Sequence, residues 1–135
     1  MPFPAHDERY SYSEEWIRVV KGFWSGERVN FQGRYFQIND LSFRPTPVAQ
    51  PRPRVYLGGE SSPARSLAAQ EADVFFINGQ PIEEIRKIIA DVSIRPRNQT
   101  QPLRFGMSAF IIARSTYKEA HAELDRLMAL QAQDD

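Results

Sequence analysis

From Val55 onward, the chain repeats one pattern three times: a short apolar run, a turn and then a helical pattern. The expected strands cover residues 55–57, 74–77 and 104–113, and the last is the longest. Successive strand–helix units imply parallel strands joined by right-handed crossovers. The repeat therefore predicts an α/β fold, either a doubly wound sheet or a barrel.

Capping residues mark where each helix of the repeat should begin. We expect Ser62 to cap the first helix, with Pro63 at its first helical position. Pro81 opens the second helix, in which one apolar stripe is formed by Ile82, Ile85, Ile89 and Val92. Thr116 and Glu119 form a capping box before the third helix.

The first 54 residues do not follow this repeat. Ser11 and Glu14 form a capping box that predicts a helix over residues 11–25. Residues 29–38 alternate loosely around Gly33, and residues 44–54 contain four prolines, which favour extended connection over a core element. We expect one domain over residues 1–135, with a helix and insertion segment at 1–54 and three βα units at 55–135.

Three parallel strands are too few for a complete α/β fold. A closed (β/α)₈ barrel takes about 250 residues, so 135 residues hold roughly half of one. The sequence thus predicts a partial TIM barrel that lacks some of its strands. Because bare strand edges and apolar faces attract partners, we expect the chain to form a homo-oligomer or to pair with another fragment.

The balance of charges argues against nucleic acid or an anionic membrane as a partner. The chain has 17 basic and 17 acidic residues, and its longest apolar run, residues 109–113, is far shorter than the ~20 residues of a membrane span. We therefore expect no nucleic-acid or membrane partner and a cytoplasmic location. With no cysteine and two isolated histidines, we also expect no metal site.

The turn after the first strand holds the residues best suited to binding an anion. Gly58 and Gly59 let backbone N–H groups approach a ligand, while Ser61 and Ser62 add hydroxyls at a helix N-terminus. Ligands gather at the carboxyl ends of parallel strands, where this turn lies. The residues fit a phosphate cradle, although a serine-capped turn explains them more simply.

Two other groups of residues are candidates for a site. The polar cluster at residues 6–10 includes His6, Arg9 and Tyr10, which either hold a cofactor phosphate or solvate the helix start. Ser108 and Phe110 should share one face of the third strand, because side chains alternate along a strand.

Five stretches of the chain, taken together, resemble the bacterial-luciferase-like flavin-dependent monooxygenases. They are residues 6–16, 31–36, 47–53, 56–61 and 104–116, in the family's order and with similar spacing. The resemblance is nearest to the alkanesulfonate and dimethylsulfone monooxygenases. It implies a TIM barrel, reduced FMN supplied by a separate flavin reductase, and use of O₂ to oxygenate a small organosulfur substrate.

The resemblance also implies roles for particular residues. Tyr10 matches the tyrosine that meets the flavin phosphate, and Ser61 matches the serine of the phosphate loop. His6 and Arg9 belong to the first of these motifs. Phosphate binding by the loop at residues 58–62 therefore becomes the favoured interpretation.

The chain departs from the family in two ways. Ser108 and Phe110 stand where alkanesulfonate monooxygenases carry an arginine and a histidine, which favours an uncharged substrate such as a sulfone. Family members are also well over twice as long, so we expect an incomplete active site. The alternative is a non-catalytic half-barrel remnant, or an assembly module that folds by association.

Overall fold

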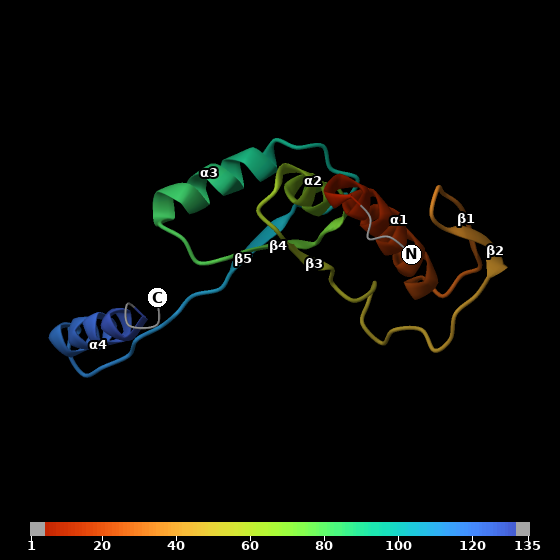
Figure 1. The fold of residues 1–135 in the computed structure, drawn as a ribbon. Helices are drawn as coiled ribbons and strands as arrows, with labels where there is room; N and C mark the ends of the chain where they lie inside the picture. Colours follow the sequence, from red (N-terminus) through yellow and green to blue (C-terminus); the bar gives the residue numbers. More distant parts are fainter. Residues whose placement is uncertain (1–4, 132–135) are drawn as a thin grey trace.

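In the computed structural model, which describes residues 5–131, a small parallel sheet lies beneath helices and a separate hairpin lies at one end (Figure 1). The helices are α1 (His6–Trp24), α2 (Ser62–Glu71), α3 (Ile82–Ser93) and α4 (Tyr117–Gln131). The strands are β1 (Val29–Gln32), β2 (Gln37–Leu41), β3 (Tyr56–Gly58), β4 (Val74–Ile77) and β5 (Arg104–Met107). None of these helices is both long and apolar enough to cross a membrane.

The predicted βα repeat is confirmed by the pairing of the strands. The sheet has the order β3-β4-β5, and both pairs are parallel. In the register of the sheet, Phe75 of β4 lies level with Leu57 of β3 on one side and Phe105 of β5 on the other. β4, the central strand, is a continuous apolar run.

The hydrophobic core lies between this sheet and the helices α2 and α3. Phe75 is 2% exposed and meets three buried alanines of the α2 segment together with apolar side chains of α3. The buried members of this core are Ala68, Ala69, Ala72, Phe75, Ile77, Ile88 and Val92. The predicted apolar stripe of α3 thus faces the sheet, except at Ile82, which is exposed.

The opposite face of the sheet has no helix over it among the described residues. Tyr56, Phe76 and Arg104 are exposed there, in positions that alternate with the core residues along each strand. The outer edges of β3 and β5 pair with no other strand within residues 5–131. The sheet therefore has the one-sided form expected of a partial barrel.

Two predicted helix starts were wrong. α1 begins at His6 rather than Ser11, because Asp7 and Glu8 place negative charge in its first turn, where the helix dipole favours it. The N-cap of α2 is Ser61 rather than Ser62, and it accepts a hydrogen bond from the Ala64 N–H. The predicted capping box of Thr116 and Glu119 is confirmed. The Glu119 carboxylate accepts a hydrogen bond from the Thr116 N–H, and the Thr116 hydroxyl accepts one from the Glu119 N–H.

Residues 29–41 form an antiparallel hairpin that the sequence did not reveal. A carboxylate on α1 holds its turn: Glu15 accepts hydrogen bonds of 2.8 to 3.1 Å from the N–H groups of Arg34, Tyr35 and Phe36. Burial acts to raise the pKa of Glu15, but these backbone hydrogen bonds outweigh it and hold the pKa below its ordinary value. The hairpin is therefore attached to α1 through an ionised carboxylate.

We expect Glu15→Gln to release the hairpin turn from α1. A neutral amide accepts hydrogen bonds more weakly than a carboxylate and cannot serve three donors equally well. Amide hydrogen exchange at residues 34–36 should accelerate about tenfold or more, in line with the strength of hydrogen bonds to charged acceptors. The matched control is Glu14→Gln, because Glu14 pairs with Arg18 within the same helix. Unchanged exchange in Glu15→Gln would contradict this attachment.

A second carboxylate joins α1 to α2. Glu71 is 3% exposed and accepts hydrogen bonds from Lys21 Nζ at 2.8 Å and Arg18 Nε at 3.0 Å. Lys21 Nζ also donates to the Glu71 backbone carbonyl at 2.7 Å. This pairing fixes the carboxyl end of α1 against the carboxyl end of α2, so both helices begin on the same side of the molecule.

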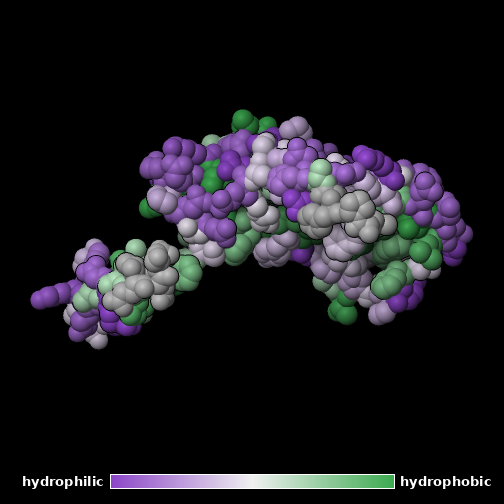
Figure 2. Space-filling model, viewed as in Figure 1, coloured by the Kyte–Doolittle hydropathy of each residue, from purple (hydrophilic) through white to green (hydrophobic). Residues whose placement is uncertain are grey.

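α4 lies apart from the rest of the described chain, at the end of an extended connection (Figure 1). In the space-filling view it forms a separate lobe (Figure 2). Its exposed apolar residues include Leu124, Leu127, Met128 and Leu130.

Candidate functional site

The loop after β3 has a backbone conformation that only glycine adopts easily. Gly59 has a φ of 143°, and a Cβ added there would lie 2.6 Å from the Cβ of Ala64. A Cβ on Gly58 would lie 3.2 Å from the Phe76 carbonyl oxygen. The loop thus turns sharply at the carboxyl end of β3 and leads directly into α2.

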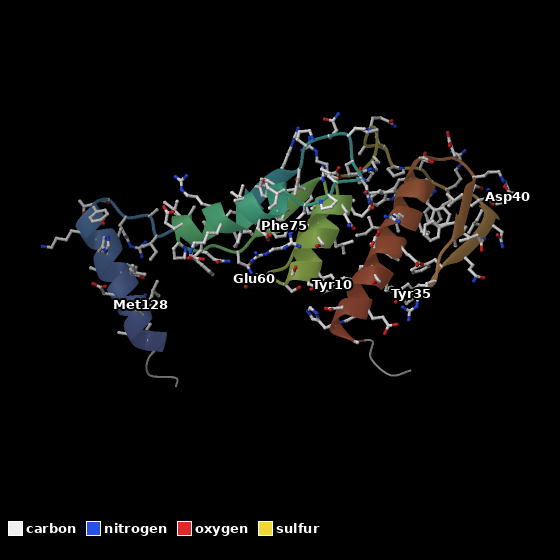
Figure 3. The ribbon with its side chains drawn as sticks, turned by 90° about the horizontal axis from the view of Figure 1, so that it is seen from above. Tyr10, Tyr35, Asp40, Glu60, Phe75 and Met128 are labelled. Atoms are coloured by element: carbon white, nitrogen blue, oxygen red, sulfur yellow. The ribbon has the colours of Figure 1, made fainter. Side chains whose placement is uncertain are left out.

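Two hydroxyl groups from distant parts of the sequence meet at this turn. Ser61 Oγ donates a hydrogen bond to the Tyr10 hydroxyl oxygen at 3.1 Å, although the residues are 51 positions apart. Figure 3 shows Tyr10 on α1 and Glu60 beside the start of α2. The His6 ring packs edge-on against Tyr10, with 5.2 Å between ring centroids. The structure therefore brings together His6, Tyr10, Ser61 and the glycine turn.

The other predicted residues of this loop region lie differently. Arg9 is exposed on α1. Ser62 is held by Arg95, whose Nη1 donates to the Ser62 carbonyl oxygen at 2.9 Å and contacts Ser62 Oγ at 3.2 Å. Ser62 therefore belongs to the packing between α2 and the segment that follows α3.

A cluster of two arginines and one aspartate lies beside the first turn of α2. Arg65 and Arg95 both bind the carboxylate of Asp91, and their hydrogen bonds hold the pKa of Asp91 below its ordinary value. Because two guanidinium groups share one carboxylate, this cluster keeps a net positive charge beside the N-terminus of α2. An anion at that N-terminus would gain from the helix dipole and from this cluster.

Glu60, Asn78 and Gln80 form a contact that sequence reasoning missed. The Glu60 carboxylate accepts hydrogen bonds from Asn78 Nδ2 and Gln80 Nε2, both at 3.4 Å. This contact joins the loop after β3 to the loop after β4, beside a pocket of about 220 Å³ that Gly58, Gly59 and Arg65 also line. The signal available in the sequence was the polar run that follows residue 77.

The prediction that Ser108 and Phe110 share one face of a strand was wrong. β5 ends at Met107, because its partner β4 ends at Ile77 and no other described strand continues the pairing. The Ser108 N–H still donates to the Ile77 carbonyl oxygen at 3.1 Å, and Ser108 Oγ accepts from the Gly79 N–H at 3.4 Å. Ser108 therefore lies at the same sheet end as the loop of residues 58–62, whereas Phe110 is fully exposed in the connection to α4.

Within residues 5–131, no three or more histidine, cysteine, aspartate or glutamate side chains form a group suited to holding a metal ion.

We expect Gly59→Ala to destabilise this turn. The new Cβ would meet Ala64, and a non-glycine residue at this φ carries backbone strain of about 1 to 3 kcal/mol. Thermal unfolding should show a clear loss of stability. Gly58→Ala is the control and should cost less, because its φ is not positive and its Cβ contact at 3.2 Å is less severe. Equal losses in the two variants would contradict the role assigned to Gly59.

Comparisons with known proteins agree on one family. The family model for luciferase-like monooxygenases matches residues 3–134. An FMNH₂-dependent dimethylsulfone monooxygenase from Pseudomonas putida is 37% identical over 128 residues, which are 95% of this chain and 35% of that protein. A protein of the same name from Pseudomonas fluorescens (strain Pf0-1) is 37% identical over 123 residues, covering 91% of this chain and 33% of that protein.

Solved structures show the same fold at low sequence identity. A long-chain alkane monooxygenase superposes with a TM-score of 0.78 at 22% identity, covering 93% of this chain and 34% of that one. DmoA from Hyphomicrobium sulfonivorans superposes with a TM-score of 0.73 at 22% identity, covering 96% of this chain and 33% of that one. The chain thus spans about a third of the length of the relatives it matches.

Proposed function

This chain belongs to the luciferase-like monooxygenase family, and on that premise we propose that it carries the flavin-phosphate site of a monooxygenase. The enzyme would use reduced FMN and O₂ to oxygenate a small organosulfur compound. One observation carries the proposal: Ser61 Oγ and the Tyr10 hydroxyl lie 3.1 Å apart beside the glycine turn that opens α2.

The residues of this turn fit a phosphate group. At the N-terminus of α2 the Ser62 N–H can donate to an anion, because an N–H in the first turn has no partner within the helix, whereas Pro63 has no N–H and the Ala64 N–H donates to Ser61 Oγ. The hydroxyls of Ser61 and Tyr10 would add two donors, and the glycine turn leaves room for close backbone approach. When bound, reduced FMN would supply the chemistry that activates O₂. The cradle would hold its phosphate and so orient the cofactor.

An uncharged organosulfur substrate fits the residues at the sheet end better than a sulfonate. Two relatives are named as dimethylsulfone monooxygenases, which supports a sulfone. Ser108 is uncharged and lies at the same sheet end as the turn between β3 and α2, so it offers a sulfonate anion no charged partner. We therefore propose a neutral sulfone as the substrate class.

We propose that a separate flavin reductase supplies reduced FMN and that this chemistry takes place in the cytoplasm. We propose a single domain over residues 1–135 that associates with another polypeptide, which can be a second copy of the chain.

The uncovered face of the β3-β4-β5 sheet and the isolated position of α4 favour a second candidate function. In that alternative the chain is a non-catalytic assembly module.

Flavin binding by single-hydroxyl variants tests the proposed phosphate site. FMN fluorescence should be quenched on titration with the chain. Tyr10→Phe and Ser61→Ala should each weaken binding about tenfold or more, because each removes a donor to a charged group. Tyr12→Phe is the matched control, since Tyr12 lies on the same helix and contacts Tyr35 and Phe36 through its ring.

The outcomes separate the two candidate functions. Loss of affinity in Tyr10→Phe but not in Tyr12→Phe would support the flavin-phosphate site. Equal affinity in all variants, or no quenching at all, would reject that site and leave the assembly module. Oxygenation assays of full-length relatives with a flavin reductase should favour dimethylsulfone over methanesulfonate, and faster sulfonate turnover would reject the proposed substrate class.

A further inference from the structure

A second pocket lies at the opposite end of the parallel sheet from the cradle. Its volume is about 410 Å³, and it is lined by the segments that lead into the three strands. Residues 50–54 precede β3, Asp73 precedes β4, and residues 99–104 lead into β5. Because the strands are parallel, their amino ends meet at this edge, far from the loops that follow them.

Three arginines and a single carboxylate line this pocket. Arg52 binds Asp73 in a bidentate manner, with Nη1 to Oδ2 at 2.6 Å and Nη2 to Oδ1 at 2.9 Å. The Val55 N–H also donates to Asp73 Oδ2 at 2.7 Å. The carboxylate is therefore fully engaged, and its charge is neutralised by Arg52.

The other two arginines have no such partner. Within residues 5–131, the guanidinium groups of Arg54 and Arg104 form no hydrogen bond and no ion pair. With Arg52 and Asp73 neutralising each other, the pocket keeps two positive charges in a chain whose formal net charge is zero. Gln50, Thr100 and Gln101 add amide and hydroxyl groups to its lining.

We propose that this pocket binds a small phosphoester through the guanidinium groups of Arg54 and Arg104. A guanidinium offers parallel N–H donors that match two oxygens of a phosphate, and two of them balance the charge of a phosphate dianion. The volume exceeds what one phosphate group needs, so a small polar body has room beside Gln50, Thr100 and Gln101. Nothing in this site depends on the flavin-phosphate site.

The test titrates isotope-labelled chain with inorganic phosphate and with glycerol phosphate, at constant ionic strength, and follows amide NMR shifts. We expect shifts at residues 99–104, with glycerol phosphate binding more tightly than inorganic phosphate. Arg54→Gln combined with Arg104→Gln should weaken binding tenfold or more. Arg86→Gln is the matched control, because Arg86 is exposed on α3 and lies outside this pocket.

Further arms separate this pocket from the cradle. Tyr10→Phe should leave the shifts at residues 99–104 unchanged, and the double arginine variant should leave FMN affinity unchanged. Because Arg54 and Arg104 are exposed, the double variant should keep the melting temperature of the parent chain. Shifts confined to residues 58–62, or equal weakening by Arg86→Gln, would overturn the proposal.

Discussion

Replacing Phe75 with alanine is expected to lower the free energy of unfolding by about 3 to 5 kcal/mol. Phe75 is 2% exposed in the central strand, level with Leu57 on one side and Phe105 on the other. Its ring belongs to the core cluster that joins the sheet to the helices α2 and α3. Truncation would therefore leave a cavity at the point where all the core elements meet.

Chemical denaturation of the purified variants measures this loss. Phe75→Leu should cost less, because leucine fills most of the space, and it keeps the comparison possible if Phe75→Ala fails to fold. Phe110→Ala is the matched control and should change stability by no more than about 0.5 kcal/mol, since Phe110 is fully exposed. Equal costs for Phe75→Ala and Phe110→Ala would contradict the assigned core.

Replacing Glu71 with alanine is expected to cost about 3 kcal/mol, because it leaves Lys21 without its carboxylate at the interface of α1 and α2. The estimate is at the lower end for a broken buried pair, since Arg18 is partly exposed and can turn to water. Glu83→Ala, on the exposed face of α3, is the control and should have little effect. Similar losses in the two variants would show that the Glu71 pair adds no stability.

The same carboxylate should make stability depend on pH. Burial acts to raise the pKa of Glu71, but hydrogen bonds from Lys21 and Arg18 outweigh it and hold the pKa below its ordinary value. A carboxyl whose pKa is lower in the folded chain contributes stability above the unfolded pKa of about 4.3, and this contribution is lost as the pH falls through the folded pKa. Denaturation at pH 7 and pH 3 should therefore show a smaller change with pH in Glu71→Gln than in the parent chain.

Local pattern was enough to predict the βα repeat. β4 matches its predicted residues, because all four of them are apolar and the strand stands out as a continuous run. The helix starts were less accurate because two signals compete there. Ser11 and Glu14 form a capping-box pattern, but the helix begins five residues earlier, where Asp7 and Glu8 lie in its first turn. Adjacent serines at positions 61 and 62 offered two possible caps for α2.

The missed features depend on contacts between distant residues. The hairpin turn is held by Glu15, about 20 positions away in sequence. Apolar residues at 109–113 suggested a longer β5, but a strand needs a partner, and β4 ends at Ile77. Glu71 gave no local sign of burial, because its partners Lys21 and Arg18 lie on another helix.

The candidate site was predicted in part. The glycine turn was recognised as a possible cradle from its residues, and the match of Tyr10 to a phosphate-binding tyrosine came from the family resemblance. The structure places Tyr10 and Ser61 in contact. That these groups bind a phosphate stays a prediction. The contact of Glu60 with Asn78 and Gln80 was missed, because it joins side chains of two loops whose relative position no local pattern specifies.

The most direct measurement compares the affinities of FMN and riboflavin for the same chain. The two flavins differ only in the phosphate group, so any difference reports on the groups that bind it. The cradle predicts that FMN binds at least tenfold more tightly, and that Tyr10→Phe narrows this difference. Equal dissociation constants for FMN and riboflavin would contradict the claim that the turn between β3 and α2 holds the flavin phosphate.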